Sequence, residues 1–122
     1  MDWSLIIPLL IAFWQVKQHD KSIKEERKRE IQLSLSSAYH KTESYYCLIE
    51  QDYSKRDRSR ELDIAEAWNK VGILIADFDK VLSQKLVLKS KLWQDGDLWN
   101  EERIKQGGIE LRKLNREVHL EC

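Results

Sequence analysis

The sequence predicts an all-α protein in which a short apolar N-terminal helix continues into an antiparallel bundle of about three helices. Apolar residues recur every three or four positions over long stretches, which is the spacing of one helix face. The 122 residues include one proline and four glycines, which indicates long helices and few loops. No alternation of apolar and polar residues persists long enough to predict a sheet.

The N-terminal segment 1–17 is predicted to be a membrane-anchoring helix. No charged side chain lies between Leu5 and Trp14, whereas the following segment, 18–30, is almost wholly charged or polar. Trp3 and Trp14 are placed as in the aromatic belts at the two membrane interfaces. The residues assigned to the anchor are Trp3, Leu5, Ile6, Ile7, Leu9, Leu10, Ile11, Phe13 and Trp14.

The shortness of this segment leaves three other interpretations. As a helix it is roughly 21 Å long, whereas bilayer hydrocarbon is about 30 Å thick. A cleaved signal peptide is disfavoured because Asp2 stands where a basic region is needed and no small-residue cleavage site follows. A helix lying in the membrane plane is disfavoured because the segment is apolar all round. A buried helix of a soluble bundle needs enclosure on every side, which a small domain supplies with difficulty.

The flanking charges predict an orientation for this anchor. Basic residues follow the apolar segment, while the N-terminal side carries only Asp2 and the terminal amine. The positive-inside rule then gives a single-pass membrane protein with its N-terminus outside and its C-terminal domain in the cytoplasm. The lysines whose 4-3-4 spacing predicts one helix face near the lipid headgroups are Lys17, Lys21, Lys24 and Lys28. A solvated face with i,i+4 ion pairs is an equal interpretation of that stripe.

The segment 31–122 is predicted to be the helical bundle, with 18–30 as a charged stalk between it and the membrane. No helix-breaking residue occurs from about Gln18 to about Asp52, so the first helix is expected to run unbroken from the anchor into the bundle. Its apolar stripe follows a heptad-like 4-3-4-3-4 spacing. The stripe consists of Ile31, Leu35, Ala38, Thr42, Tyr45 and Ile49.

A polar turn precedes the second predicted helix, which Asp57 or Ser59 can cap. Apolar residues recur near every 3.5 positions from Leu62 to Leu86 and predict one long helix. Gly72 lies in the middle of it and costs roughly 1 kcal/mol relative to alanine. That glycine is tolerable where another helix approaches closely.

A second polar turn precedes the third predicted helix. Asn100 is expected to be the N-cap, and Trp99 before it is expected to pack on Ile104 as a hydrophobic staple. Gly107 and Gly108 interrupt the third helix, and they predict either a kink or a close helix crossing.

Arg112 and His119 are the catalytic candidates, although weak ones, because their spacing places both on one helix face. This R-x6-H pattern superficially resembles the signature of HEPN ribonucleases, which are also helical bundles. The resemblance covers eight residues, and Lys113 stands where that family usually has Asn, Asp or His. It implies that Arg112 steadies the scissile phosphate and that His119 acts as general base.

No metal site is predicted. His40 and Glu43 share a helix face, but their order is the reverse of the Glu-x-x-His motif of di-metal bundles, and there is no second copy. Asp77 and Asp79, two apart, would point to nearly opposite sides of a helix. The aspartates at 95 and 97 lie in a turn, where this residue type is ordinary.

The sequence therefore predicts a non-enzymatic protein without cofactors, whose bundle mediates oligomerisation or recruits a partner. The expected partners are the lipid bilayer and either further copies of the chain or another membrane or cytosolic protein. A net charge of zero gives no case for nucleic acid. One alternative is a membrane-perturbing effector that acts through the N-terminal helix, of the toxin, phage-defence or lysis type. The second is a HEPN-like ribonuclease that uses Arg112 and His119.

Overall fold

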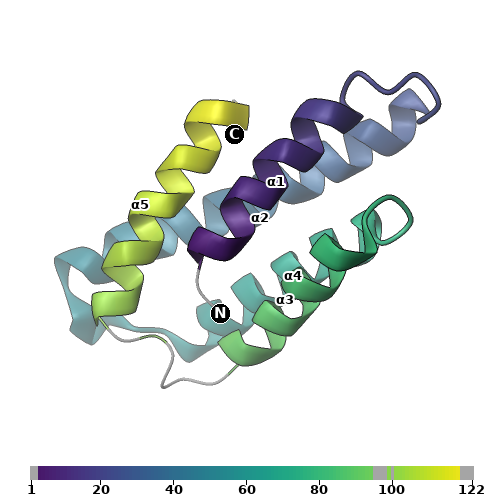
Figure 1. Cartoon of the computed structure of the whole chain (residues 1–122). Coiled ribbons are helices and arrows are strands. Elements are labelled where there is room, and N and C mark those ends of the chain that lie inside the picture. The colour runs from purple at the N-terminus through teal and green to yellow at the C-terminus, as the bar shows by residue number, and fades with distance from the viewer. Residues whose placement is uncertain (1–2, 95–98, 100, 119–122) are drawn as a thin grey trace.

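The computed structural model describes residues 3–94, 99 and 101–118. Over these residues the protein is all-helical, without a strand, which confirms the predicted all-α class. The described part of the chain forms five α-helices, where the prediction had an anchor helix continuing into a bundle of about three. Figure 1 shows the α-helices, and a short 3-10 helix, η1 (Tyr53–Lys55), follows α2. The α-helices are α1 (Trp3–Lys17), α2 (Glu25–Gln51), α3 (Arg58–Ile75), α4 (Lys80–Trp93) and α5 (Glu101–Val118).

The helices enclose a single hydrophobic core. In Figure 1, α3 and α4 form an antiparallel hairpin, α2 runs back antiparallel to α1, and α5 lies beside α1. α1 packs chiefly on α5 and also touches α4, while α2 packs on α3 and α5. The largest fully buried side chains include Trp68, Trp99, Tyr39 and Tyr45, so aromatic rings fill much of the space between the helices.

α1 is built into this core. Among the residues that the structure describes, no helix is long and apolar enough to cross a membrane. The predicted single-pass placement, with the N-terminus outside and the C-terminal domain in the cytoplasm, is therefore wrong. The physical reason is that α1 needs enclosure on one side only, and α4 and α5 supply it. Its buried side chains are Trp3, Ile6, Ile7, Leu10, Phe13 and Trp14.

A turn separates α1 from α2, so the predicted unbroken helix is also wrong. The Asp20 carboxylate accepts hydrogen bonds from the Ser22 amide at 2.9 Å and the Ser22 hydroxyl at 2.6 Å. These bonds to the backbone and side chain two residues on stabilise a turn in competition with a helix. As a result α2 begins at Glu25, and the chain reverses direction.

A second break divides the predicted long helix into α3 and α4. The Asp79 carboxylate accepts a hydrogen bond from the Leu82 amide at 2.9 Å, which caps the start of α4. α4 folds back on α3 at Gly72, where an added Cβ would lie 3.0 Å from Val87 Cγ2 and 3.2 Å from the Ser83 carbonyl oxygen. The close approach expected at this glycine is confirmed.

Of the two alternatives predicted for the glycines of α5, a kink or a close crossing, the close crossing is found at Gly107. A Cβ on Gly107 would lie 2.8 Å from Trp3 Cδ1 and 3.0 Å from Tyr46 Cε2. Only glycine therefore lets α5 approach both α1 and α2 at this level. Trp99 is buried, and its indole N–H donates to the Trp93 carbonyl at 3.0 Å. The predicted N-cap, Asn100, lies outside the described residues.

Candidate interaction surface on the first helix

The inner face of α1 is fixed in the core by Trp3. Its indole N–H donates a hydrogen bond to the Tyr46 hydroxyl at 3.1 Å, and its ring meets the edges of Trp68 and Trp93 at centroid distances of 4.9 and 4.6 Å. The Lys89 ammonium lies 4.8 Å from the Trp3 ring centroid. These edge-on ring contacts and the cation–π contact give α1 one defined rotation about its axis.

That rotation leaves an apolar face of α1 outward. α1 carries no charged side chain before Lys17, and Gln15 is the exposed polar residue on the described part of its solvent side. Leu9 is 39% exposed and Val16 is 64% exposed, and Pro8 and Ala12 are also exposed. We call Pro8, Leu9, Ala12 and Val16 the α1 outer face.

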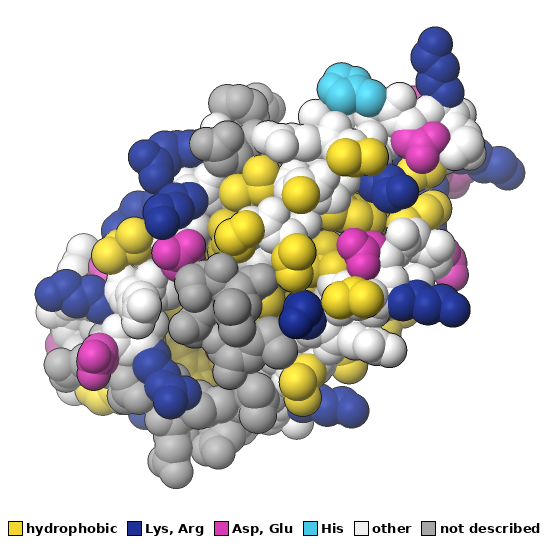
Figure 2. All heavy atoms as spheres, viewed as in Figure 1, with side chains coloured by type: hydrophobic (Ala, Val, Ile, Leu, Met, Phe, Trp, Pro, Cys, Tyr) yellow, Lys and Arg dark blue, Asp and Glu magenta, His cyan; other side chains and the backbone are white. Residues whose placement is uncertain are grey.

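A second set of exposed apolar side chains lies on α4. Val81 is 61% exposed and Leu88 is 48% exposed, and their spacing places both on one side of α4 together with Lys85. Figure 2 shows hydrophobic side chains along α1 and again over α4, with charged side chains between them. Exposed apolar side chains gathered on two neighbouring helices are a typical sign of an interaction site.

A groove lies on the other side of the α1 outer face, against α5. Its volume is about 650 Å³. Its α1 wall is mainly apolar, whereas its α5 wall consists of Glu110, Lys113 and Arg116. Lys113 Nζ lies 3.2 Å from Glu110 Oε1, so charges of both signs border the apolar surface.

The residues assigned to a membrane anchor divide between these two faces. Leu9 points outward and Ile11 is half-buried against the core, whereas the side chain of Leu5 lies outside the described part of the chain. The remaining anchor residues are core side chains: Trp3, Ile6, Ile7, Leu10, Phe13 and Trp14.

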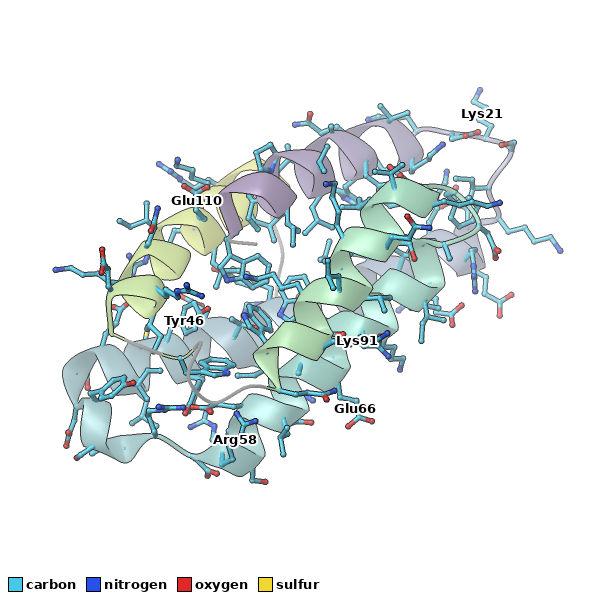
Figure 3. The ribbon with its side chains drawn as sticks, turned by 60° about the horizontal axis from the view of Figure 1, so that its bottom comes forward. Lys21, Tyr46, Arg58, Glu66, Lys91 and Glu110 are labelled. Carbon is cyan, nitrogen blue, oxygen red and sulfur yellow. The ribbon has the colours of Figure 1, made fainter. Side chains whose placement is uncertain are left out.

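The four lysines assigned to lipid headgroups do not share a helix face. Lys17 ends α1, Lys21 lies in the turn and projects from the far end of the bundle in Figure 3, and Lys24 is the N-cap of α2. Lys28 is 7% exposed, and its Nζ lies 3.1 Å from Glu25 Oε1. The stripe fails because the turn after Lys17 breaks the helix on which the 4-3-4 spacing depends.

Of the two catalytic candidates, the structure places only Arg112, because His119 lies outside the described residues. Arg112 Nη2 is 3.6 Å from Glu50 Oε2, and its side chain is half exposed. This guanidinium faces a carboxylate on α2, so a phosphate would have to compete with Glu50 for it. In the described part of the chain, we identify no further residue beside Arg112 that would support the ribonuclease interpretation.

The acidic candidates have structural partners. Asp77 Oδ2 lies 3.3 Å from Arg27 Nη2, and Asp79 caps α4, so the pair occupies a turn and not the helix on which the prediction placed it. In the part of the chain that is described, no three His, Cys, Asp or Glu side chains come together as a metal site. His40 and Glu43 are partly buried on α2, and the aspartates at 95 and 97 lie outside the described residues.

A buried polar cluster joins the end of α2 to the start of α3. Glu61 is fully buried and accepts hydrogen bonds from Arg56, Arg58 and the Tyr45 hydroxyl. Burial raises the pKa of Glu61, but the hydrogen bonds from Arg56, Tyr45 and Arg58 outweigh it and hold the pKa below its usual value. Burial and the hydrogen bond to Glu61 raise the pKa of Tyr45 to about 12. Every group in the cluster faces a protein partner, so we assign it a structural role.

Sequence reasoning missed the α4 part of the surface. Val81 and Leu88 fall outside the apolar stripe that contains Leu82 and Leu86, so the stripe does not predict them. An apolar residue that does not fit the buried stripe of its helix is the available signal for an exposed patch.

No known protein family matches the sequence, and neither a curated protein nor a solved structure resembles it.

Proposed function

We propose that this protein is a non-enzymatic helical interaction module that self-associates through the α1 outer face and the neighbouring apolar residues of α4. One observation carries the proposal: α1 buries one side in the core and presents Leu9 and Val16, 39% and 64% exposed, on the other. Removing such side chains from water contributes up to about 1.5–3 kcal/mol each. A second apolar surface is therefore the natural complement of this face.

The spacing of the outer face suits packing against another helix. Pro8, Ala12 and Val16 lie four residues apart and form a ridge, with Leu9 beside it. Ridges of this i±4 type interdigitate at a crossing angle of about −50°. Ala12, the smallest side chain, lies at the middle of the ridge, where it allows two helix axes to approach each other.

The charges around the face favour a second copy of the same chain. Glu110 on one side of the groove is acidic, and Lys113 and Arg116 are basic. In a two-fold dimer the same patch meets itself, so each sign of charge can meet its opposite across the axis. The zero net charge of the chain means that no overall repulsion opposes association.

Sedimentation equilibrium over a wide concentration range tests the proposal. We expect the full chain to dimerise reversibly and Leu9→Glu and Val16→Glu to sediment as monomers, because each carboxylate would be buried without a partner. Leu62→Glu is the matched control, because Leu62 is 44% exposed on α3, and it should dimerise like the wild type.

A wild-type chain that stays monomeric at every concentration contradicts the proposal. A monomer that instead co-floats with lipid vesicles, and loses this property in Leu9→Glu, would favour the membrane-perturbing alternative. Equal loss of association in Leu62→Glu would place the interface elsewhere.

A further inference from the structure

A long polar groove follows α2 on a surface that does not include the α1 outer face. One hollow of about 1,120 Å³ lies between the end of α1 and α2 and is lined from Glu25 to Lys41 along α2. A smaller hollow of about 310 Å³ lies between α2 and α3 and extends to Ser44. His40 and Lys41 line both hollows, so the two form one continuous track, which we call the α2 groove.

Basic side chains outnumber acidic ones in the α2 groove. Its cations are Lys28, Arg29, Lys41 and Arg60, and its carboxylates are Glu25 and Asp63. Both carboxylates already pair with lysines of the groove, at 3.1 Å for Glu25 with Lys28 and 3.2 Å for Asp63 with Lys41. The positive charge that remains is carried by the two arginines.

One of the four cations, Lys28, is buried against the protein and has little contact with solvent. Lys28 is only 7% exposed, so its ammonium group has little freedom to leave the wall of the groove. Its partner Glu25 is 88% exposed in its side chain, and such exposed carboxylates form weak, replaceable pairs. A carboxylate brought by a ligand would meet a preorganised cation at this point.

From these features we infer that the α2 groove binds an acidic helical segment of another protein. The track from Glu25 to Ser44 is about 28 Å long at 1.5 Å per residue, which suits about five turns of a partner helix. Leu33, 61% exposed, borders the larger hollow and offers an apolar contact of the kind on which helix-in-groove binding depends.

Single-stranded nucleic acid fits the same track less well. Binding of unpaired bases depends on exposed aromatic rings as well as positive charge. The tryptophan that lines the groove, Trp14, is 6% exposed and belongs to the core. A groove that has positive charge but no exposed aromatic ring favours carboxylates of a protein ligand over unpaired bases.

The test uses a labelled synthetic helical peptide of about five turns, with glutamates on one face and leucines beside them. A matched peptide carries lysine in place of every glutamate. Fluorescence anisotropy with the full chain should show saturable binding of the glutamate peptide and none of the lysine peptide. Affinity should fall at least about tenfold between 0.1 M and 1 M salt, where the Debye length shortens from about 10 Å to 3 Å.

Charge reversal in the groove identifies the site. The double variant Arg29→Glu/Lys41→Glu should weaken binding at least about tenfold, because like charges then face each other across the interface. Lys70→Glu, an exposed change on α3 outside the groove, should leave the affinity unchanged. Circular dichroism of each variant checks that the bundle is intact.

Three results would overturn the inference. They are the absence of saturable binding by the glutamate peptide, unchanged affinity in the double variant, and equal or tighter binding of an oligouridylate. None of them bears on dimerisation through the α1 outer face, so the two proposals stand or fall separately.

Discussion

Arg56 and Glu61 form a two-point ion pair in which Nε lies 3.0 Å from Oε2 and Nη2 lies 3.0 Å from Oε1. The carboxylate is fully buried, while the guanidinium side chain is 28% exposed. Tyr45, near the end of α2, donates to the same carboxylate. This arrangement holds the start of α3 against the end of α2.

Removing one partner of a buried ion pair leaves the other uncompensated and costs about 3–5 kcal/mol, so Glu61→Gln should destabilise the fold by about 3 kcal/mol. The expected loss is toward the lower end since Arg56 retains some contact with water. Urea unfolding measures it. Glu66→Gln is the control, because Glu66 lies on the exposed side of α3 in Figure 3 and should change stability by less than about 0.5 kcal/mol.

The same carboxylate makes stability depend on pH. The pKa of Glu61 is lower in the folded chain than in the unfolded chain, so its contribution is complete above about pH 4.3, the ordinary value for glutamate. The contribution is lost as the pH falls through the lowered folded pKa. Urea unfolding from neutral to acidic pH should therefore show the gap between wild type and Glu61→Gln shrink on acidification. A gap that is constant with pH would contradict this account.

Gly107→Ala and Gly108→Ala should act in opposite directions although the glycines are neighbours. A Cβ on Gly107 would overlap Trp3 and Tyr46 in the core, and overpacking costs about 1–3 kcal/mol. A Cβ on Gly108 would lie 2.8 Å from Glu50 Oε1, the end of a flexible side chain, and 3.9 Å from Arg112 Nη2, which is ordinary contact. Alanine there gains up to about 1 kcal/mol in helix propensity. Thermal unfolding of both variants compares them directly, and equal shifts would refute the close crossing at Gly107.

Trp3→Phe should destabilise the protein by about 1–3 kcal/mol, because the Tyr46 hydroxyl loses its hydrogen-bond donor inside the core. Burial raises the pKa of Tyr46 well above its ordinary value, so ionisation cannot relieve the loss near neutral pH. Tyr46→Phe in the Trp3→Phe background should then add little. A double-mutant cycle by urea unfolding measures this coupling, and simple additivity would contradict it.

The helical stripes were predictable, whereas the role of α1 was not. Ile31, Leu35 and Ile49 are buried as their spacing predicts. A repeat of this kind places its apolar residues on one side of the helix, and that side faces the core. An apolar helix such as α1 has the same composition whether lipid or protein covers it. The assumption that it needed enclosure on every side was the error, since Leu9 and Val16 remain outside.

The break between α1 and α2 has a signal in the sequence. Within residues 3–94, Asp-x-Ser tripeptides are formed by Asp20 and Ser22, by Asp52 and Ser54, and by Asp57 and Ser59. In each of them the aspartate accepts a hydrogen bond from the serine amide and stops or starts a helix. The polar stretch 53–59 predicts a turn that contains the third tripeptide and most of the second, whereas no glycine or proline marks the first.

The most direct test of the central claim, that α1 has one core side and one free side, compares two adjacent leucines. Leu10 is 1% exposed and Leu9 is 39% exposed. At protein concentrations low enough to suppress association, urea unfolding should show that Leu10→Ala loses about 2–5 kcal/mol. Leu9→Ala should lose less than about 1 kcal/mol, as an exposed substitution does. Equal and small losses in both variants would mean that α1 is not part of the folded core, and the account would be wrong.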